Sequence, residues 1–378
     1  AKSPVLQRLL RPAVVGSRRS DSTMTTPHAL TRRSVLGLAM ALPAIGHAAT
    51  RPDTHSLGEA AAAAGILFGA SATSNVLDDP AYAALHSAHS RLLVTDLALK
   101  FDYLRPSEDI FDFAEADALL AFARSQAIGF RGAAMIWNDW PAAWLKGKSS
   151  SELTRIFDEH IDVVGSRYAG AMQSWDVVNE PFWPDAGEPG GYRTGPWYGA
   201  MGQDYIPRAF ERVARVDPKA KLVLNEAFCE QNDALGKAVR SHMLPLIDKL
   251  QDRGVKLDAI GLQAHIRPGL PFDIDAFLRF LDEIAARKLD IYLTEFDIED
   301  NTLPFDIARR DALVAGWTAR FLNPVLENRK VKAVITWQLA DRHSWYRDPA
   351  VAGARGYSFS ARPLPFDDGY NDKPMAQA

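Results

Sequence analysis

Two glutamates of the chain follow apolar runs and have the chemistry for acid–base or nucleophilic catalysis. Glu180 ends the run SWDVVNE (174–180), directly after Asn179, and Glu295 lies within LTEFDI (293–298). The apolar residues before each glutamate predict a buried strand, so each carboxyl group should stand near a strand end. Two carboxyl groups facing each other across a cleft can cleave a glycosidic bond: one protonates the leaving oxygen, and the other attacks the anomeric carbon or activates water.

Two other uses of these acids have to be weighed. Clustered carboxylates can bind a metal ion with His265 as a nitrogen ligand, but the sequence has no His-x-x-x-His pattern and no acid cluster of ligand spacing. Cys229 is the only cysteine, which excludes an intrachain disulfide and a cysteine-based zinc site. We therefore predict neither a metal nor a cofactor. A rim of purely structural ion pairs is the second alternative.

The segments that must position these residues alternate in character. Amphipathic patterns such as 151–169 and 274–288 predict helices, and they separate near-continuous apolar runs. The eight predicted strands are 65–71, 91–99, 129–137, 174–180, 220–226, 257–265, 290–297 and 332–341. Buried strands separated by helices indicate a parallel sheet, and eight such units predict one (β/α)8 barrel, a TIM barrel, over residues 51–378. An open doubly wound sheet is the alternative, but no glycine-rich phosphate loop follows the first strand.

Polar residues gather at the predicted strand ends, where barrels of this class build their active sites. These residues are Lys100, Asn138, Asn179, Glu180, Glu226, Gln263, His265, Glu295, Asp297 and Asp341. Any one of them could be an ordinary loop residue. Their convergence on one rim predicts a functional cleft there.

The composition is that of an ordinary globular protein, with 47% hydrophobic and 24% charged residues and a formal net charge of −4. This balance gives no electrostatic reason to expect nucleic acid or an anionic membrane as a partner. Nine Trp, ten Tyr and 18 Phe supply enough flat apolar surface for a core and a stacking cleft.

Residues 1–50 resemble a targeting segment. Arg32 and Arg33 precede an apolar run from Val35 to Ile45 that is too short to span a bilayer, and small residues follow it. The paired arginines resemble the twin-arginine type of signal, so we expect export to the periplasm or the medium. We also expect translation to begin at Met24. A buried helix with a basic start is the alternative.

From about Ser56 to the C-terminus the chain resembles glycoside hydrolase family 10, the endo-β-1,4-xylanases. Several motifs carry the resemblance in order: LALKFDYLRPSEDIFDFAEAD (97–117), WDVVNE (175–180), IGLQAHI (260–266), LTEFDI (293–298), TWQLADRHSW (336–345) and PLPFDDGYNDKP (363–374). Asn-Glu-Pro alone is shared by several barrel glycosidases, whereas the ordered set is specific.

The resemblance implies a role for each matching residue. Glu180 would be the general acid/base and Glu295 the nucleophile, with Glu180 in the more apolar, desolvated position. His265 would hold the Glu295 carboxylate and Asp297 would orient the imidazole. Asn179 would bond the 2-hydroxyl of the sugar at the cleavage point. The other residues predicted to contact substrate are Asp96, Lys100, Trp137, Asn138, Gln263, Trp337 and Trp345.

The chain departs from the family pattern on the wall that binds the glycone. The Glu-Asn pair of the family aligns with Asp96 and Leu97, its Trp-His pair with Trp137 and Asn138, and its glycine after the last strand tryptophan with Gln338, which should intrude near the cleavage subsite. A monomeric, retaining endo-β-1,4-xylanase that binds xylan or xylo-oligosaccharides and acts through a covalent glycosyl-enzyme intermediate remains the main prediction. A retaining barrel glycosidase on another β-glycoside and a non-catalytic carbohydrate-binding barrel are the alternatives.

Overall fold

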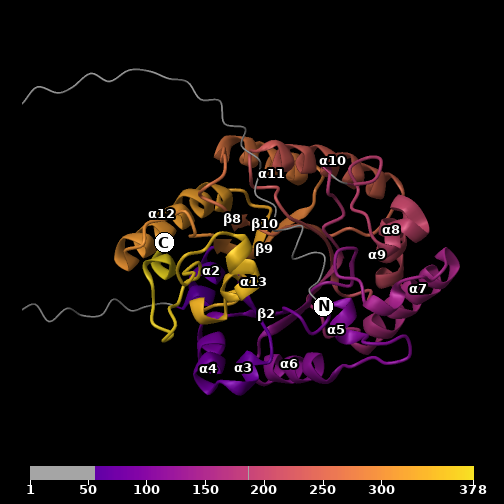
Figure 1. Cartoon of the computed structure of the whole chain (residues 1–378), viewed down its shortest axis with the longest axis horizontal. Coiled ribbons are helices and arrows are strands. Elements are labelled where there is room, and N and C mark those ends of the chain that lie inside the picture. The colour runs from indigo at the N-terminus through magenta and orange to yellow at the C-terminus, as the bar shows by residue number, and fades with distance from the viewer. Residues whose placement is uncertain (1–55, 186) are drawn as a thin grey trace, which may run out of the picture.

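The computed structural model describes residues 56–185 and 187–378, so our predictions for residues 1–50 lie outside it. Parallel strands form a closed barrel, because β10 pairs with both β9 and β1 (Figure 1). The barrel strands are β1 (Leu67–Ala72), β2 (Leu92–Thr95), β3 (Gly129–Gly132), β5 (Ser174–Asn179), β6 (Lys221–Glu226), β7 (Ala259–Leu262), β9 (Asp290–Ile298) and β10 (Val331–Thr336). The predicted (β/α)8 barrel is confirmed.

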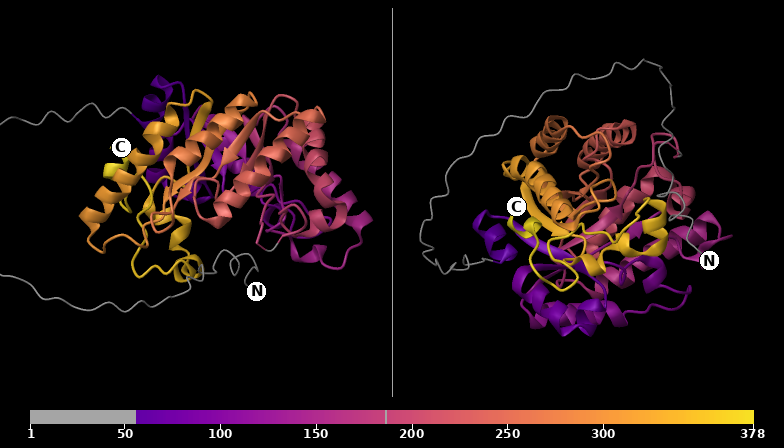
Figure 2. Two further views of the ribbon diagram at one scale, coloured as in Figure 1. Left: turned by 90° about the horizontal axis from the view of Figure 1, so that it is seen from above. Right: turned by 60° about the vertical axis from the view of Figure 1, so that its left-hand side comes forward.

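Helices connect the strands and lie around the outside of the barrel, as the two views of Figure 2 show. They are α2 (Leu57–Ala63), α3 (Asn75–Asp78), α4 (Pro80–His89), α5 (Phe101–Leu104), α6 (Ala114–Ser125), α7 (Ser150–Arg167), α8 (Pro196–Met201), α9 (Tyr205–Val216), α10 (Ala234–Asp252), α11 (Ile274–Ala286), α12 (Ile307–Leu326) and α13 (Pro349–Ala354). Short 3-10 helices cover Ala143–Leu145, Gly202–Asp204, Asp341–His343, Trp345–Arg347 and Pro374–Gln377.

Helix α7 shows why these segments fold as they do. Ser149 and Glu152 form a capping box that satisfies free N–H groups at its start. Its buried residues recur every three or four positions and form one apolar stripe: Leu153, Ile156, Phe157, Ile161 and Val164. This stripe packs toward the barrel in the main core, which also contains Trp175 of β5. A second, smaller cluster fills the barrel interior with Leu92, Val94, Val223, Ala259, Tyr292, Ala333 and Ile335.

Two of the predicted strands are interrupted. The run 129–137 divides into β3 and β4 (Ile136–Trp137), and Thr95 Oγ1 bonds the backbone N–H and C=O of Ala133 in the gap. The run 257–265 divides into β7 and β8 (His265–Ile266), because Ala264 has a φ of +61° and leaves the extended conformation. Both short strands lie toward the rim, where Trp137 of β4 and His265 of β8 line the cleft.

In the part of the chain that the structure describes, no helix is long and apolar enough to cross a membrane. The same residues contain no group of three or more His, Cys, Asp and Glu side chains arranged to hold a metal ion.

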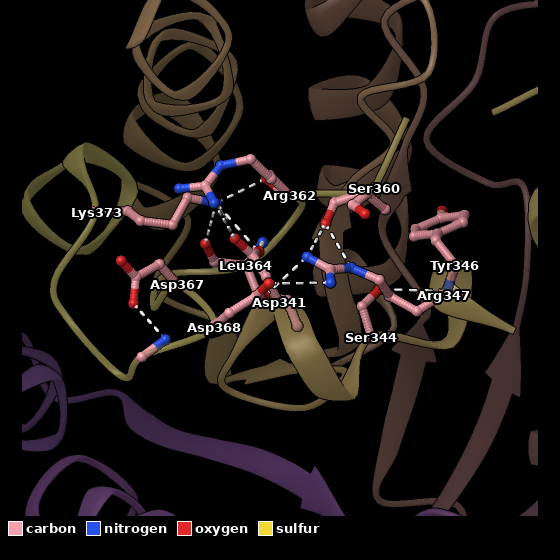
Figure 3. A network of polar contacts seen from close by, with 12 residues as sticks. Asp341, Ser344, Tyr346, Arg347, Ser360, Arg362, Leu364, Asp367, Asp368 and Lys373 are labelled. Atoms are coloured by element: carbon pink, nitrogen blue, oxygen red, sulfur yellow. Dashed lines mark hydrogen bonds and ion pairs between the residues drawn. The ribbon is translucent and has the colours of Figure 1, made fainter. Parts of the chain in front are cut away.

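A buried ion pair fastens the C-terminal segment to the loop after β10 (Figure 3). Lys373 Nζ lies 3.1 Å and 2.9 Å from the two carboxylate oxygens of Asp341, and both side chains are almost fully buried. The same ammonium donates to the carbonyl oxygens of Arg362 at 2.7 Å and Leu364 at 2.9 Å. Asp341 Oδ1 also accepts the Leu364 N–H at 3.0 Å. These contacts fix the path of the chain behind the 3-10 helix that follows Ala340.

Replacing Lys373 with methionine should lower the free energy of unfolding by about 3–5 kcal/mol, because Asp341 would be left buried without its main partner. Denaturant midpoints of the two proteins measure this difference. Asp368→Asn is the matched control: Asp368 pairs with Arg347 on the same segment, but 53% of its side chain is exposed, so we expect a change below about 1 kcal/mol. Equal small losses in both variants would contradict the proposed anchoring.

Candidate active site

The two predicted catalytic glutamates line one cleft of about 390 Å³ at the C-terminal rim of the barrel. Glu180 directly follows β5 and has a φ of +49°, a region that a non-glycine residue seldom adopts, so its backbone turns out of the strand direction at this point. Glu295 lies in the upper half of β9. Their side chains are 8% and 12% exposed, so both carboxyl groups are largely removed from water yet reach the cleft.

A chain of amides links the two carboxyl groups. Gln263 Nε2 donates to Glu180 Oε1 at 2.8 Å and lies 3.4 Å from Asn179 Oδ1. Asn225 Nδ2 donates to the same Asn179 oxygen at 2.9 Å and to Glu295 Oε1 at 3.0 Å. Since these amides come from β6 and from the end of β7, which lie between β5 and β9 in the sheet, the strand order itself sets the spacing of the pair.

An arginine that the sequence analysis missed lies against Glu180. Arg193 Nη2 is 2.9 Å from Glu180 Oε2, and its Nε donates to the Glu180 carbonyl at 2.8 Å. Arg193 also pairs with Asp139, so two carboxylates share one guanidinium. Glu180 is buried as we predicted, but its surroundings are not apolar, because a cation contacts the carboxyl group directly. This cation stabilises the carboxylate that remains after Glu180 gives up its proton.

Beside Glu295 stands an imidazole held between two carboxylates. His265 Nε2 lies 3.4 Å from Glu295 Oε2, and Nδ1 lies 2.9 Å from Asp297 Oδ2. Burial alone would lower the pKa of His265, but the Asp297 and Glu295 carboxylates outweigh it and hold that pKa well above its usual value. Asp297 is fixed in turn by Trp345 Nε1 at 3.0 Å and Tyr346 Oη at 3.2 Å. The two carboxylates thus favour the imidazolium form of His265, which lies directly against Glu295.

Replacing Asp297 with asparagine should lower the pKa of His265 by about one unit or more, because the Asp297 carboxylate stabilises the imidazolium. The measurement is the pH titration of the His265 ring followed by NMR in the wild type and the variant. A His265 titration that stays in place while the catalytic rate falls would show that Asp297 acts through packing alone.

The glycone wall carries a lysine among three tryptophans. Lys100 Nζ lies 5.5 Å, 5.2 Å and 5.7 Å from the ring centroids of Trp137, Trp140 and Trp337, and 3.8 Å from Asp96 Oδ1. All five side chains line the cleft. The rings stabilise the cation and fix its position at the wall of the cleft.

Gln338 also belongs to this wall, but its amide is directed away from free space. Its Nε2 donates to Asp96 Oδ2 at 2.9 Å, and its Oε1 accepts from Tyr82 Oη at 2.9 Å and Asn75 Nδ2 at 3.2 Å. The residue is 1% exposed and has a φ of +73°, a conformation that favours glycine. The family pattern has glycine at this position. The predicted intrusion near the cleavage subsite is therefore replaced by a contact that orients Asp96.

Asn138 is the predicted site residue that the structure places elsewhere. Its Oδ1 accepts the backbone N–H groups of Trp197 at 3.1 Å and Tyr198 at 3.3 Å, at the start of α8. It does not line the cleft. We correct its predicted role in substrate binding to that of a contact that holds α8, because its side chain turns behind the strand end to satisfy free helix N–H groups.

Of the other predicted rim residues, Asp341 belongs to the buried ion pair with Lys373 and Glu226 is fully buried behind the cleft, and the rest are near the two glutamates or on the cleft wall. Lys100, Asp96, Trp137, Gln263, His265, Trp337 and Trp345 line the cleft, whereas Asn179 and Asp297 lie behind the residues that they orient. Missed residues fall into two groups. Asn225 stands before Glu226 at the end of β6, so its strand-end position could have indicated it. Arg193 and Trp140 lie in loops, where no periodicity signals a role.

The rim cleft of this (β/α)8 barrel holds two carboxyl groups. One lies beside an imidazole and the other beside amide and guanidinium donors. This is the architecture of a glycoside hydrolase. The family model described as glycosyl hydrolase family 10 matches residues 56–378. The chain therefore belongs to glycosyl hydrolase family 10.

Several xylanases are similar to this chain in sequence or structure. Endo-1,4-beta-xylanase B of Thermotoga neapolitana is 29% identical over 301 residues, which cover 79% of this chain and 82% of that protein. The beta-1,4-xylanase of Dictyoglomus thermophilum is 30% identical over 309 residues, or 77% of this chain and 82% of that protein. The crystal structure of xylanase 10B from Thermotoga petrophila RKU-1 in complex with xylobiose has a TM-score of 0.75 and 29% identity, covering 85% of this chain and 95% of that one.

Proposed function

We propose that this glycoside hydrolase is a retaining endo-β-1,4-xylanase that acts on xylan or xylo-oligosaccharides. The observation that carries the proposal is the placement of Glu180 and Glu295 in one cleft, each with partners suited to a different task. Glu295 is contacted by the His265 imidazole and by the Asn225 amide, which hold its carboxyl group in place for attack as a nucleophile. Glu180 lies at the strand end beside the Arg193 guanidinium, which stabilises the negative charge of the carboxylate once the proton has left.

In the first step, Glu295 attacks the anomeric carbon while the bond from that carbon to the leaving oxygen breaks. Glu180 donates its proton to the leaving oxygen, so the departing group leaves as a neutral alcohol. The nucleophile thereby forms a covalent ester with the sugar. Asn179, held by Asn225 and Gln263, is placed to bond the sugar hydroxyl next to the reacting carbon.

In the second step, the Glu180 carboxylate takes a proton from water, and the oxygen of that water attacks the anomeric carbon. The bond between the sugar and Glu295 breaks, and both glutamates return to their first states. Two inversions at the same carbon give net retention. Arg193 stabilises the carboxylate form of Glu180 between the steps, when that residue acts as a base.

Product analysis tests the proposal. Xylan and xylo-oligosaccharides of defined length should yield shorter β-1,4-linked products, and proton NMR should show the β-anomer of the new reducing end before mutarotation. First formation of the α-anomer would exclude the retaining mechanism. A panel of other β-glucans and aryl glycosides, run at the same enzyme concentration, ranks the substrate classes.

Leu97 favours keeping a second candidate function. It lines the glycone end of the cleft at a position where the family pattern has asparagine, and it offers a sugar no hydrogen bond. A retaining glycosidase that acts on a different β-glycoside, such as a substituted oligosaccharide or a glycosylated small molecule, would suit this wall. A panel in which aryl glycosides are cleaved and plain xylan is not would support this second function.

We further propose that the protein is exported through the twin-arginine-type segment around Arg32 and Arg33. The support is the sequence pattern alone: paired arginines, a short apolar run and small residues after it. Fractionation of cells that express the full chain, with and without Arg32→Lys and Arg33→Lys, tests this. Retention of the double variant inside the cell is the expected result.

A further inference from the structure

The leaving-group end of the cleft contains buried polar side chains that the catalytic steps do not use. In the sheet order, β10, β1, β2 and β3 carry the glycone wall, and β5, β6, β7 and β9 carry the two glutamates and their amides. Glu230 and Gln231 follow β6, Arg267 follows β8, and Arg355 follows α13; all four line the cleft. The first three come from the β6–β9 side of Glu180 and Glu295, and Arg355 comes from the loop after β10 and meets Arg267 at Glu299.

Two arginines meet at this end on a single carboxylate. Arg267 Nε donates to Glu299 Oε2 at 2.8 Å, and Arg355 Nη1 lies 3.6 Å from the same oxygen. The Arg355 side chain is 7% exposed. Its Cζ lies over the Trp345 ring, 5.7 Å from the ring centroid. Among the described residues, no hydrogen-bond acceptor reaches its buried Nε. Both guanidinium groups thus contact the Glu299 carboxylate, and the Nε of Arg355 has no acceptor among the described residues.

The neighbouring side chains are also without partners. Gln231 is 3% exposed, and neither atom of its amide has a hydrogen-bond partner among residues 56–185 and 187–378; the same holds for Glu230 Oε2. Burial raises the pKa of Glu230 to about 7, so below that pH this residue is neutral and can donate a hydrogen bond. Buried polar groups normally have partners, so this group of side chains is built to meet a polar ligand.

We propose that the leaving-group end of the cleft is a subsite for a carboxylate carried by the aglycone, which accepts hydrogen bonds from Arg355 and Arg267. The planar guanidinium matches a carboxylate in geometry and charge, and the low exposure of Arg355 strengthens the contact. The preferred substrates are then β-glycosides whose leaving group carries a carboxylate, such as an acid-bearing sugar or an aromatic acid. This inference rests on the proposed function and narrows its substrate class.

Two matched substrates test the subsite: 4-carboxyphenyl β-xylobioside and its 4-carboxamide. They differ in charge but hardly in shape, and their intrinsic reactivities cancel when variants are compared with the wild type. The readout is the ratio of kcat/KM for the acid to that for the amide, measured below about pH 7. We expect this ratio to fall about tenfold in Arg355→Met, and to fall in the wild type as salt is raised.

Arg267→Met is the second variant, since Arg355→Met removes a buried group, and its ratio should fall in the same direction. Arg279→Met is the charge-matched control, because Arg279 is exposed on α11, and its ratio should equal that of the wild type. An unchanged ratio in both cleft variants, or a wild-type ratio without salt dependence, overturns the subsite. If the wild type hydrolyses neither compound, the proposed function fails, and calorimetric binding of the two xylobiosides to the same proteins still decides on the subsite.

Discussion

Replacing Glu295 with glutamine should reduce kcat on every substrate by about four orders of magnitude or more, because an amide cannot attack the anomeric carbon. Glutamine is isosteric and can keep the contact with Asn225 Nδ2, which the wild-type carboxylate accepts at 3.0 Å. The fold should therefore survive. The loss should be equal for aryl glycosides and for natural glycans, since both require the same attack.

Two measurements make this prediction specific to a nucleophile. Glu295→Ala supplied with azide should form the α-glycosyl azide, because an anion in the vacated space attacks the face opposite the leaving group. Glu283→Gln on the exposed side of α11 should retain wild-type rates, as its side chain is 59% exposed. A Glu295→Gln protein that keeps more than a few per cent of wild-type kcat would refute the assignment.

Replacing Glu180 with alanine should give a selective defect. Without a proton donor, formation of the glycosyl-enzyme from substrates with poor leaving groups should slow by about 10²- to 10⁴-fold. Glycosides whose leaving group is already acidic need little protonation, so their first step should be nearly preserved. Their overall turnover then becomes limited by the second step, in which Glu180 acts as the base.

Pre-steady-state kinetics separates these effects. An activated aryl glycoside should show a burst of phenol followed by slow turnover in Glu180→Ala, and azide should accelerate the slow phase and give the β-glycosyl azide. The configuration of the azide product thus distinguishes the two glutamates. Equal losses on activated and natural substrates, without a burst, would argue against general-acid catalysis by Glu180.

The barrel and much of its site could be predicted because strand patterns carry two kinds of information. A continuous apolar run marks a strand buried on both faces, and the residue after it marks the rim. Glu180, Gln263 and Glu295 were found in this way. The family resemblance then supplied their roles, which composition and spacing alone do not contain.

Contacts made by loops could not be predicted, since tertiary packing and not periodicity decides them. Arg193 lies 13 positions beyond Glu180 in the sequence, yet its guanidinium sits 2.9 Å from that carboxyl group. Asn138 follows a strand end, but its amide satisfies the start of α8. Gln338 was expected to intrude near the cleavage subsite, and only the positions of Asp96 and Tyr82 show that its amide bonds to the protein instead.

The division of the barrel into two runs of neighbouring strands separates what can vary from what cannot. Glu180, Asn225, Gln263 and Glu295 come from β5, β6, β7 and β9, their loops and short extensions, and are linked to one another by hydrogen bonds. Asp96, Leu97, Lys100 and Gln338 belong to the opposite run of strands. Substitutions at these four positions can therefore accumulate during evolution, or be introduced by design, without removing any of those hydrogen bonds. The same protein frame can acquire new sugar preferences while its reaction stays the same.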